Sequence, residues 1–246
     1  MNRVATRTLA RFSWFIDSVT VVLVLAAFYL ALFYAPTERT MGDVQRIFYF
    51  HVPSAMMAFL GFAIVMVASI AFLATGSRRW DGAAQAAAEV GLLFCTITLL
   101  TGPVWARSAW GVWWTWDARL STTLILWLIY VAYLMLRGYM REDLRMRRFS
   151  AVLGILGALD VPIVYFSVKW WRTQHPTSFI MEREGLDPHM AVALRVGMIA
   201  IFFLFLALLG KRIALERLRA ARDSLRTEVE MREMGLATTS DPGGEA

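Results

Sequence analysis

The sequence of 246 residues has a single cysteine, Cys95, so no disulfide can form within the chain. It also lacks the motif C-x-x-C-H, which excludes thioether attachment of a cofactor to the chain's own cysteines. Any large cofactor is therefore expected to be held without a covalent bond. Histidine is scarce as well, since only three occur.

Charged residues are few for a chain of this length. They make up 18% of the sequence, whereas 58% of the residues are hydrophobic and the mean hydropathy is +0.53. Soluble domains are about half apolar and about a quarter charged. The balance found in this chain is typical of a protein embedded in lipid.

Six apolar runs have the length that a helix needs to cross a bilayer, about 17–25 residues. A segment inside lipid must satisfy its own backbone hydrogen bonds, which predicts helices for such runs. We therefore predict an all-α polytopic membrane protein with six transmembrane helices. The first run is expected to stay as an anchor, because no small-residue cleavage pattern follows it. The runs lie near Trp14–Ala35, His51–Ala74, Ala83–Ala106, Leu120–Leu136, Phe149–Val168 and Met190–Gly210.

The basic residues predict the orientation of these spans. Six spans put both termini on one side of the membrane, and 17 of the 25 Lys and Arg residues fall in segments on that side. The positive-inside rule then predicts that both termini are cytoplasmic. This topology signal accounts for the net charge of +6, which requires no nucleic-acid partner.

Three loops are expected on the outer side, at residues 36–50, 105–119 and 169–189. All three histidines lie in these loops or at their ends, and half of the ten tryptophans lie in the second loop. Residues able to bind a metal and a flat ring are thus predicted to gather at one face. The histidines are His51, His175 and His189, and the tryptophans are Trp105, Trp110, Trp113, Trp114 and Trp116.

Four of these tryptophans fall within seven positions of the stretch WGVWWTWDARLS, residues 110–121. One interpretation is an aromatic belt at the membrane interface, where Trp is favoured. A belt accounts for one or two tryptophans per helix end but poorly for four. The alternative is a flat apolar platform for a flat apolar ligand. Gly111 permits either a turn with φ > 0 or a close approach of a ligand to the backbone.

The histidines are candidate metal ligands, since neutral imidazole is a common axial ligand of haem iron. His51 precedes Pro53, which marks an expected helix start, and His175 lies in the third loop. A hydrogen-bonded structural role is the alternative for a lone histidine at a membrane interface. We expect His189 at the start of the sixth helix, mainly in a structural role.

Three arginines, Arg46, Arg119 and Arg172, lie within a few residues of a histidine or of the tryptophan stretch. Guanidinium groups suit carboxylates such as the haem propionates. A solvated loop position is the alternative for each of them. Asp117 has two options of its own, an ion pair with Arg119 or a cap on the fourth helix.

The stretch WGVWWTWD fits the signature W-G-x-x-W-x-W-D, and by it the chain resembles the tryptophan-rich (WWD) family of haem-handling proteins of cytochrome c biogenesis. The matching residues are Trp110, Gly111, Trp114, Trp116 and Asp117. The stretches YFHVPSA, TGPVW, WDARLST and FSVKWWRTQH are similar to those of a shorter member of the family. The resemblance covers most of residues 14–210.

The resemblance implies a protein that binds and delivers haem and is not an enzyme. His51 and His175 are the implied axial ligands of the iron, and haem b is the implied cargo, bound transiently and without a covalent bond. The site is expected at the periplasmic face of the bacterial inner membrane, from which haem passes to a periplasmic haem chaperone. The implied partners are the ATP-binding subunit, the second membrane subunit and the small single-span subunit of an ABC-type complex, besides the membrane lipid.

The chain divides into three predicted segments. Residues 1–210 form the six-span membrane domain with the tryptophan-rich loop 105–121, residues 211–236 form a charged cytoplasmic helix, and residues 237–246 form a disordered tail. The charged helix is either a docking surface for a partner or a solvated extension.

Charged residues inside the spans are costly and often functional. We expect Asp160 in a polar pair within the bundle, and Glu89 near the cytoplasmic end of the third span in contact with a partner helix. Two other functions stay open, a conduit that exports haem across the bilayer and a scaffold that binds no haem. A conduit predicts polar residues on several helices at the midplane, where only Asp160 is expected, alongside a few Thr and Ser.

Overall fold

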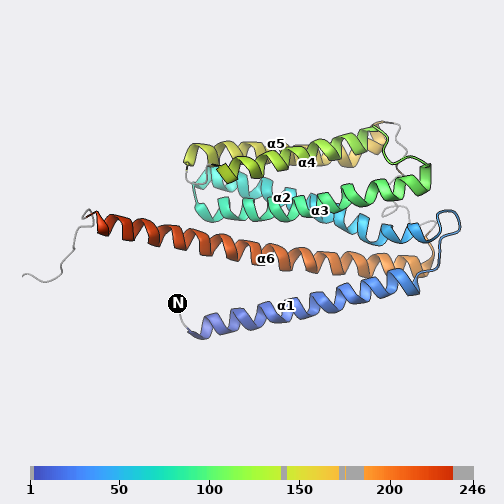
Figure 1. The fold of residues 1–246 in the computed structure, drawn as a ribbon, viewed down its shortest axis with the longest axis horizontal. Coiled ribbons are helices and arrows are strands. Elements are labelled where there is room, and N and C mark those ends of the chain that lie inside the picture. The colour runs from blue at the N-terminus through green and yellow to red at the C-terminus, as the bar shows by residue number, and fades with distance from the viewer. Residues whose placement is uncertain (1–2, 140–142, 172–174, 176–185, 235–246) are drawn as a thin grey trace, which may run out of the picture.

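The computed structural model describes residues 3–139, 143–171, 175 and 186–234 (Figure 1). Within them the chain is helical, without a named strand, and six helices are long and apolar enough to cross a membrane. The predicted all-α fold with six spans is confirmed. The helices are α1 (Arg3–Tyr29), α2 (Phe48–Thr75), α3 (Arg78–Trp110), α4 (Ala118–Tyr139), α5 (Leu144–Trp170) and α6 (Pro188–Glu233). A π-helical turn, Leu30–Tyr34, extends α1, and a 3-10 helix, Asp43–Ile47, leads into α2.

The helix ends differ from the predictions in three places. Helix α2 begins at Phe48, so Pro53 lies inside the helix rather than at its start. Helix α3 continues to Trp110, which makes the beginning of the predicted second loop helical. Helix α6 runs without a break through residues 210 and 211, so the charged segment directly continues the last span. The predicted tail, residues 237–246, lies outside the described residues.

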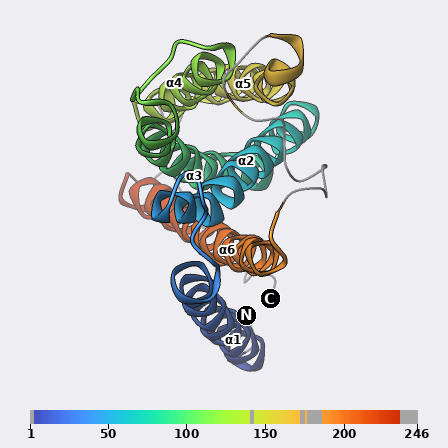
Figure 2. The same ribbon diagram turned by 90° about the vertical axis from the view of Figure 1, so that its right-hand side faces the viewer.

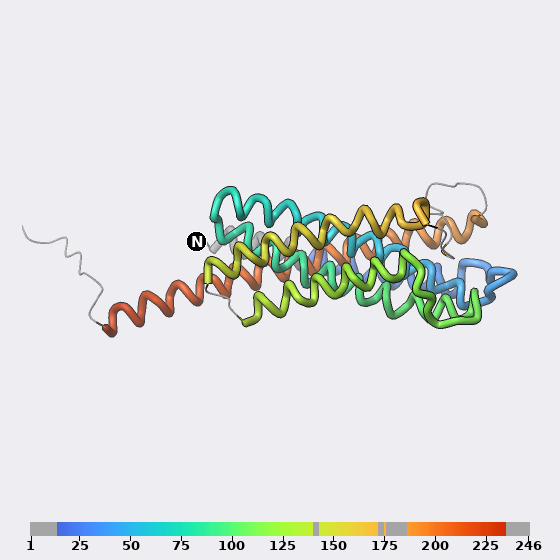
Figure 3. Tube along the Cα trace, turned by 90° about the horizontal axis from the view of Figure 1, so that it is seen from above, coloured from blue at the N-terminus to red at the C-terminus, as the bar shows by residue number. Residues whose placement is uncertain are grey.

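Helices α2 to α5 form a four-helix group, α6 packs along α2 and α3, and α1 packs mainly on α6 (Figures 1 and 2). Helix α1 starts and α6 stops at the same end of the bundle, which we call the terminal end. The tryptophan stretch lies at the opposite end, the tryptophan end. Seen from above, α6 extends beyond the other helices at the terminal end (Figure 3).

Glycines allow the helices to approach closely. A Cβ atom built on Gly61 of α2 would lie 2.7 Å from the Cα atom of Gly91 in α3. A Cβ atom on Gly197 of α6 would lie 2.7 Å from the carbonyl oxygen of Tyr49. Pro53 cannot donate the hydrogen bond that this carbonyl would otherwise accept within α2. Small residues at such contacts are the usual basis of helix packing in membranes, where burial of apolar surface gives little driving force.

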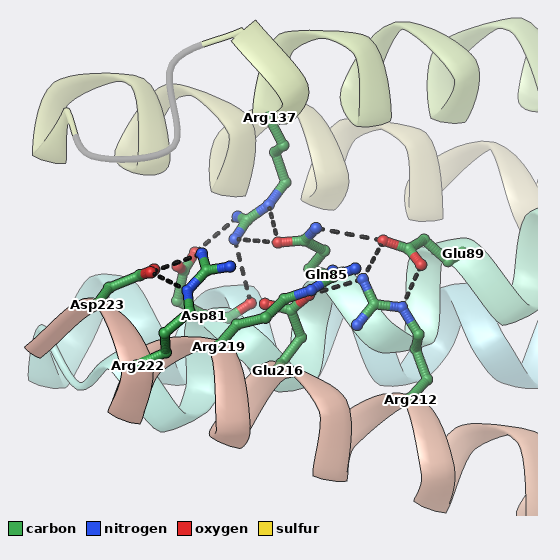
Figure 4. A network of polar contacts seen from close by, with 9 residues as sticks. All are labelled: Asp81, Gln85, Glu89, Arg137, Arg212, Glu216, Arg219, Arg222 and Asp223. Atoms are coloured by element: carbon green, nitrogen blue, oxygen red, sulfur yellow. Dashed lines mark hydrogen bonds and ion pairs between the residues drawn. The ribbon is translucent and has the colours of Figure 1, made fainter. Parts of the chain in front are cut away.

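A polar network joins α3, α4 and α6 near the terminal end (Figure 4). Arg137 of α4 is buried and donates to Asp81 Oδ1 at 2.6 Å and to Gln85 Oε1 at 3.2 Å. Arg212 of α6 donates to both carboxylate oxygens of Glu89. The contact expected between Glu89 and a partner helix is therefore made within the chain, with α6.

The expected polar pair of Asp160 is not formed among the described residues. Its Oδ2 atom is buried and has no hydrogen-bond partner there. Helix α5 continues through Pro162 to Trp170, so this carboxyl group stays inside the span.

We predict that Gly197→Ala destabilises the protein by about 1–3 kcal/mol, the usual cost of overpacking. The added methyl group meets a backbone oxygen, which cannot rotate away as a side chain can. Gly210→Ala on the same helix is the control, because no atom lies within 4 Å of its Cβ position. Thermal unfolding of the purified protein in detergent, followed by tryptophan fluorescence, measures both. Equal melting temperatures for the two variants would contradict this account of the α2–α6 contact.

Candidate functional site

A cavity opens between α2, α3, α4 and α5 at the tryptophan end. Its polar lining includes His51 and Arg119, together with His175 from the segment after α5. Deeper in the bundle the lining becomes apolar, with Phe59, Cys95 and Leu99. The cavity therefore combines imidazole and guanidinium groups with an apolar interior, the combination that a flat apolar ligand with charged substituents needs.

His51 is oriented by Thr101 of the neighbouring helix. Its Nδ1 atom lies 2.8 Å from the Thr101 Oγ1 atom, and the Thr101 hydroxyl donates its own proton to the Ile97 carbonyl at 2.7 Å. When the hydroxyl donates to this carbonyl, its oxygen accepts from His51 Nδ1–H, and this tautomer leaves the Nε2 lone pair available. A metal-binding histidine usually has such a partner on its second nitrogen.

His175 lines the same cavity and interacts electrostatically with His51. Its Nδ1 atom lies 3.5 Å from the Asp117 Oδ2 atom and has no hydrogen-bond partner among the described residues. The ring of Trp110 contacts it edge-on, with 5.3 Å between centroids. Burial lowers the pKa of His175 below 6.5, the nearby Arg119 guanidinium lowers it further, and Asp117 partly opposes both. The imidazole is therefore neutral at pH 7, the form that binds metals.

Asp117 and Gly111 set the geometry of the loop between α3 and α4. The Asp117 Oδ1 atom accepts from the Leu120 amide at 2.9 Å and caps α4, which is one of its two predicted roles. The alternative ion pair with Arg119 is not formed in the described part of the chain. Gly111 has φ 78° and ends α3, and no atom lies within 4 Å of its Cβ position. The turn requires glycine at this position, because a residue with a Cβ atom is strained at such a positive φ angle.

The tryptophans divide between the cavity and the surface. Trp105 and Trp114 line the cavity, and Trp110 packs between Trp105 and His175. Trp116 is 77% exposed and contacts Trp114 edge-on; Trp113 is exposed as well. The Nε1 atom of Trp114 is buried without an acceptor among the described residues, so an acceptor group of a ligand would satisfy it.

The three candidate arginines have different surroundings. Arg119 lines the cavity, and no carboxylate of a described residue lies within 4.0 Å of its guanidinium group. Arg46 is engaged elsewhere. It bonds the carbonyl oxygens of Ala31 and Ala35 and the side chains of Thr37 and Asp43. Because its donors tie the loop between α1 and α2 to the end of the first span, Arg46 is not part of the candidate site. Arg172 lies outside the described residues.

His189 lies apart from the cavity. Helix α6 begins at Pro188, and Asp187 caps it by accepting from the His189 amide at 2.8 Å. The predicted structural role at the start of the sixth helix agrees with this position. The residue that sequence reasoning missed is Thr101, since its hydroxyl lies 50 positions from His51 and only the packing of α3 on α2 brings them together.

Comparison with known proteins gives matches over most of the chain. The haem exporter protein C family, CcmC, matches residues 2–228. The haem exporter protein C of Bradyrhizobium diazoefficiens is 34% identical over 232 residues, which cover 94% of this chain and 86% of that protein. The Escherichia coli protein of the same name is 35% identical over 186 residues, 74% of this chain and 75% of that protein. A ccmC-like mitochondrial protein of Marchantia polymorpha, described as putative in cytochrome c biosynthesis, is 34% identical and covers 79% of each chain.

The tryptophan signature, the six spans and the extent of these matches agree with one another, and the chain belongs to the haem exporter protein C (CcmC) family.

Proposed function

We propose that this protein binds haem in the cavity at the tryptophan end and delivers it for cytochrome c biogenesis. The observation that carries the proposal is the presence of two histidines in one cavity, one with its Nε2 lone pair available and the other neutral at pH 7. The names of its relatives, which refer to haem export and to cytochrome c biosynthesis, support the same role.

In this proposal the haem is cargo, and His51 and His175 bind its iron from opposite sides. Trp105 and Trp114 provide apolar walls for the porphyrin. Arg119 pairs with a propionate, because its guanidinium group has no carboxylate partner among the described residues. The Trp114 indole, whose N–H group has no acceptor there, is a second donor to the propionates.

We further propose that the tryptophan end faces the periplasm and that both termini lie in the cytoplasm of a bacterium. Haem b is held non-covalently and passes to a periplasmic haem chaperone. The exposed side chains of Trp113 and Trp116 are the surface that the chaperone would contact. The protein acts without catalysing a reaction, within a complex of an ATP-binding subunit, a second membrane subunit and a small single-span subunit. The distribution of Lys and Arg supports this orientation.

Binding at one face is favoured over a conduit through the bundle. Below the cavity, the rings of Phe62 and Tyr130 stack at 3.8 Å between centroids, and both side chains are fully buried. Tyr133 and Phe94 are buried in the same apolar core. This packing separates the cavity from the terminal end in the described part of the chain.

We expect His51→Ala and His175→Ala each to lose most of the bound haem, because each removes an axial ligand. His189→Ala is the matched control, since this histidine does not line the cavity and is exposed at the start of α6. The visible spectrum of the purified protein measures the Soret band and the low-spin α and β bands. A low-spin spectrum that survives both cavity substitutions would falsify the axial assignment.

Thr101→Val is expected to weaken haem binding about 10- to 100-fold, the usual effect of removing the partner of a ligating histidine. The substitution keeps the shape of the side chain and removes the acceptor of the His51 Nδ1 proton. Thr98→Val is the control, because Thr98 lines the same cavity but its hydroxyl donates only to the Phe94 carbonyl at 2.9 Å. Haem titration followed at the Soret band compares the two. The same loss in both variants would mean that Thr101 contributes polarity rather than orientation.

The haem complex should keep its spectrum as the pH falls from 8 to 6.5 and change only below that. Burial and Arg119 hold the pKa of His175 below 6.5, so its imidazole stays neutral over this interval and protonates later. Protonation removes the lone pair that binds iron. A titration of the haem-loaded protein, with the low-spin bands as readout, checks this. A transition of the low-spin bands centred above pH 6.5 would contradict it.

A further inference from the structure

A second pocket lies at the terminal end, far along the bundle from the haem cavity. Residues of α3, α4, α5 and α6 line it, so it is a space between four helices and not a feature of one surface. Arginine dominates its lining. The six arginines are Arg78, Arg79, Arg137, Arg147, Arg217 and Arg219, and the three carboxylates are Asp81, Glu216 and Asp223.

Each carboxylate in this pocket already has arginine partners. Asp81 lies 2.6 Å from Arg137 and 3.4 Å from Arg147. Glu216 lies 2.8 Å from Arg219, and its second partner is Arg212 at 2.6 Å. These carboxylates therefore neutralise the arginines next to them, several of which are drawn in Figure 4.

Asp223 is the third carboxylate, and Arg222 lies 2.7 Å from it. Three arginines of the lining have no such partner. No carboxylate of a described residue lies within 4.0 Å of Arg78, Arg79 or Arg217. The first two begin α3 and the third lies on α6, so two separate helices bring unpaired positive charge to one pocket. Unpaired guanidinium groups that converge on a pocket make a site for an anion with several acceptor oxygens.

The pocket lies at the level of the membrane interface. Trp80, between Arg79 and Asp81 in α3, is exposed, as are Tyr139 at the end of α4 and Trp14 in α1. Exposed Trp and Tyr side chains at helix ends are typical of the headgroup region. Ala83, Met146 and Ile213 contribute apolar surface to the same lining, which suits the glycerol and first acyl carbons next to a phosphate.

We propose that this pocket binds the phosphate group of an anionic phospholipid, with Arg78, Arg79 and Arg217 as its ligands. Basic pockets between transmembrane helices are known to bind anionic headgroups. A pocket between helices at the interface, with apolar residues beside its arginines, favours a lipid phosphate over an acidic protein segment. The bound lipid would link the start of α3 to the extension of α6.

The test is native mass spectrometry of the full-length protein in detergent, titrated with dioleoylphosphatidylglycerol, with dioleoylphosphatidylcholine or with inorganic phosphate. We expect retention of phosphatidylglycerol and at least tenfold weaker binding in the triple variant Arg78→Gln/Arg79→Gln/Arg217→Gln. The control triple variant Arg145→Gln/Arg148→Gln/Arg226→Gln removes the same charge near the same end, outside the pocket. Its affinity should change less than threefold.

The proposal is overturned if phosphatidylcholine binds as well as phosphatidylglycerol, or if both triple variants lose binding equally, because diffuse charge then suffices. Saturation by inorganic phosphate at the same concentration as the lipid would make a soluble anion the ligand and overturn the lipid assignment. If the triple variant unfolds, the single variant Arg217→Gln, which changes one exposed side chain, gives a second measurement of the affinity for phosphatidylglycerol. Its expected loss is about threefold, and an unchanged affinity would count against the site.

Discussion

The close contact between α2 and α3 is the constraint on which the rest of the structure depends. Gly61 and Gly91 bring the two backbones together, and the same pairing places the Thr101 hydroxyl beside His51. A membrane bundle gains little from burying apolar surface, so it relies on such close packing. The orientation of the first proposed iron ligand is thus a consequence of helix packing many residues away from it.

Apart from Asp160 inside α5, the charged side chains that face the bundle lie towards its two ends, with an apolar core between them. At the tryptophan end, the histidines and Arg119 have few protein partners, which suits a site for cargo. At the terminal end, Asp81, Glu89 and Glu216 are each bound by arginines, which suits a structural role. The unpaired arginines beside that network are the exception, and they are the basis of the proposed lipid site.

Much of the fold could be predicted from the sequence, because hydrophobic runs of bilayer length have few alternatives to a helix. The six spans and the gathering of histidine and tryptophan at one end follow from local patterns, whereas only the structure decides between the two predicted roles of Asp117. Local patterns did not predict that α2 begins at Phe48 or that α3 ends at Trp110. Pro53 lies inside α2, and the Tyr49 carbonyl that it leaves without its usual donor lies against Gly197 of α6, a contact between distant parts of the chain.

The sequence by itself determined the class of the protein, its spans and the types of residue that could bind haem. Only the tertiary structure decided which of those residues share a cavity. Arg46 and Arg119 look equivalent in the sequence. In the structure Arg46 donates to backbone carbonyls, whereas Arg119 lines the cavity. The physical reason is that a guanidinium group takes the acceptors that folding brings within its reach, and those acceptors come from other helices and loops.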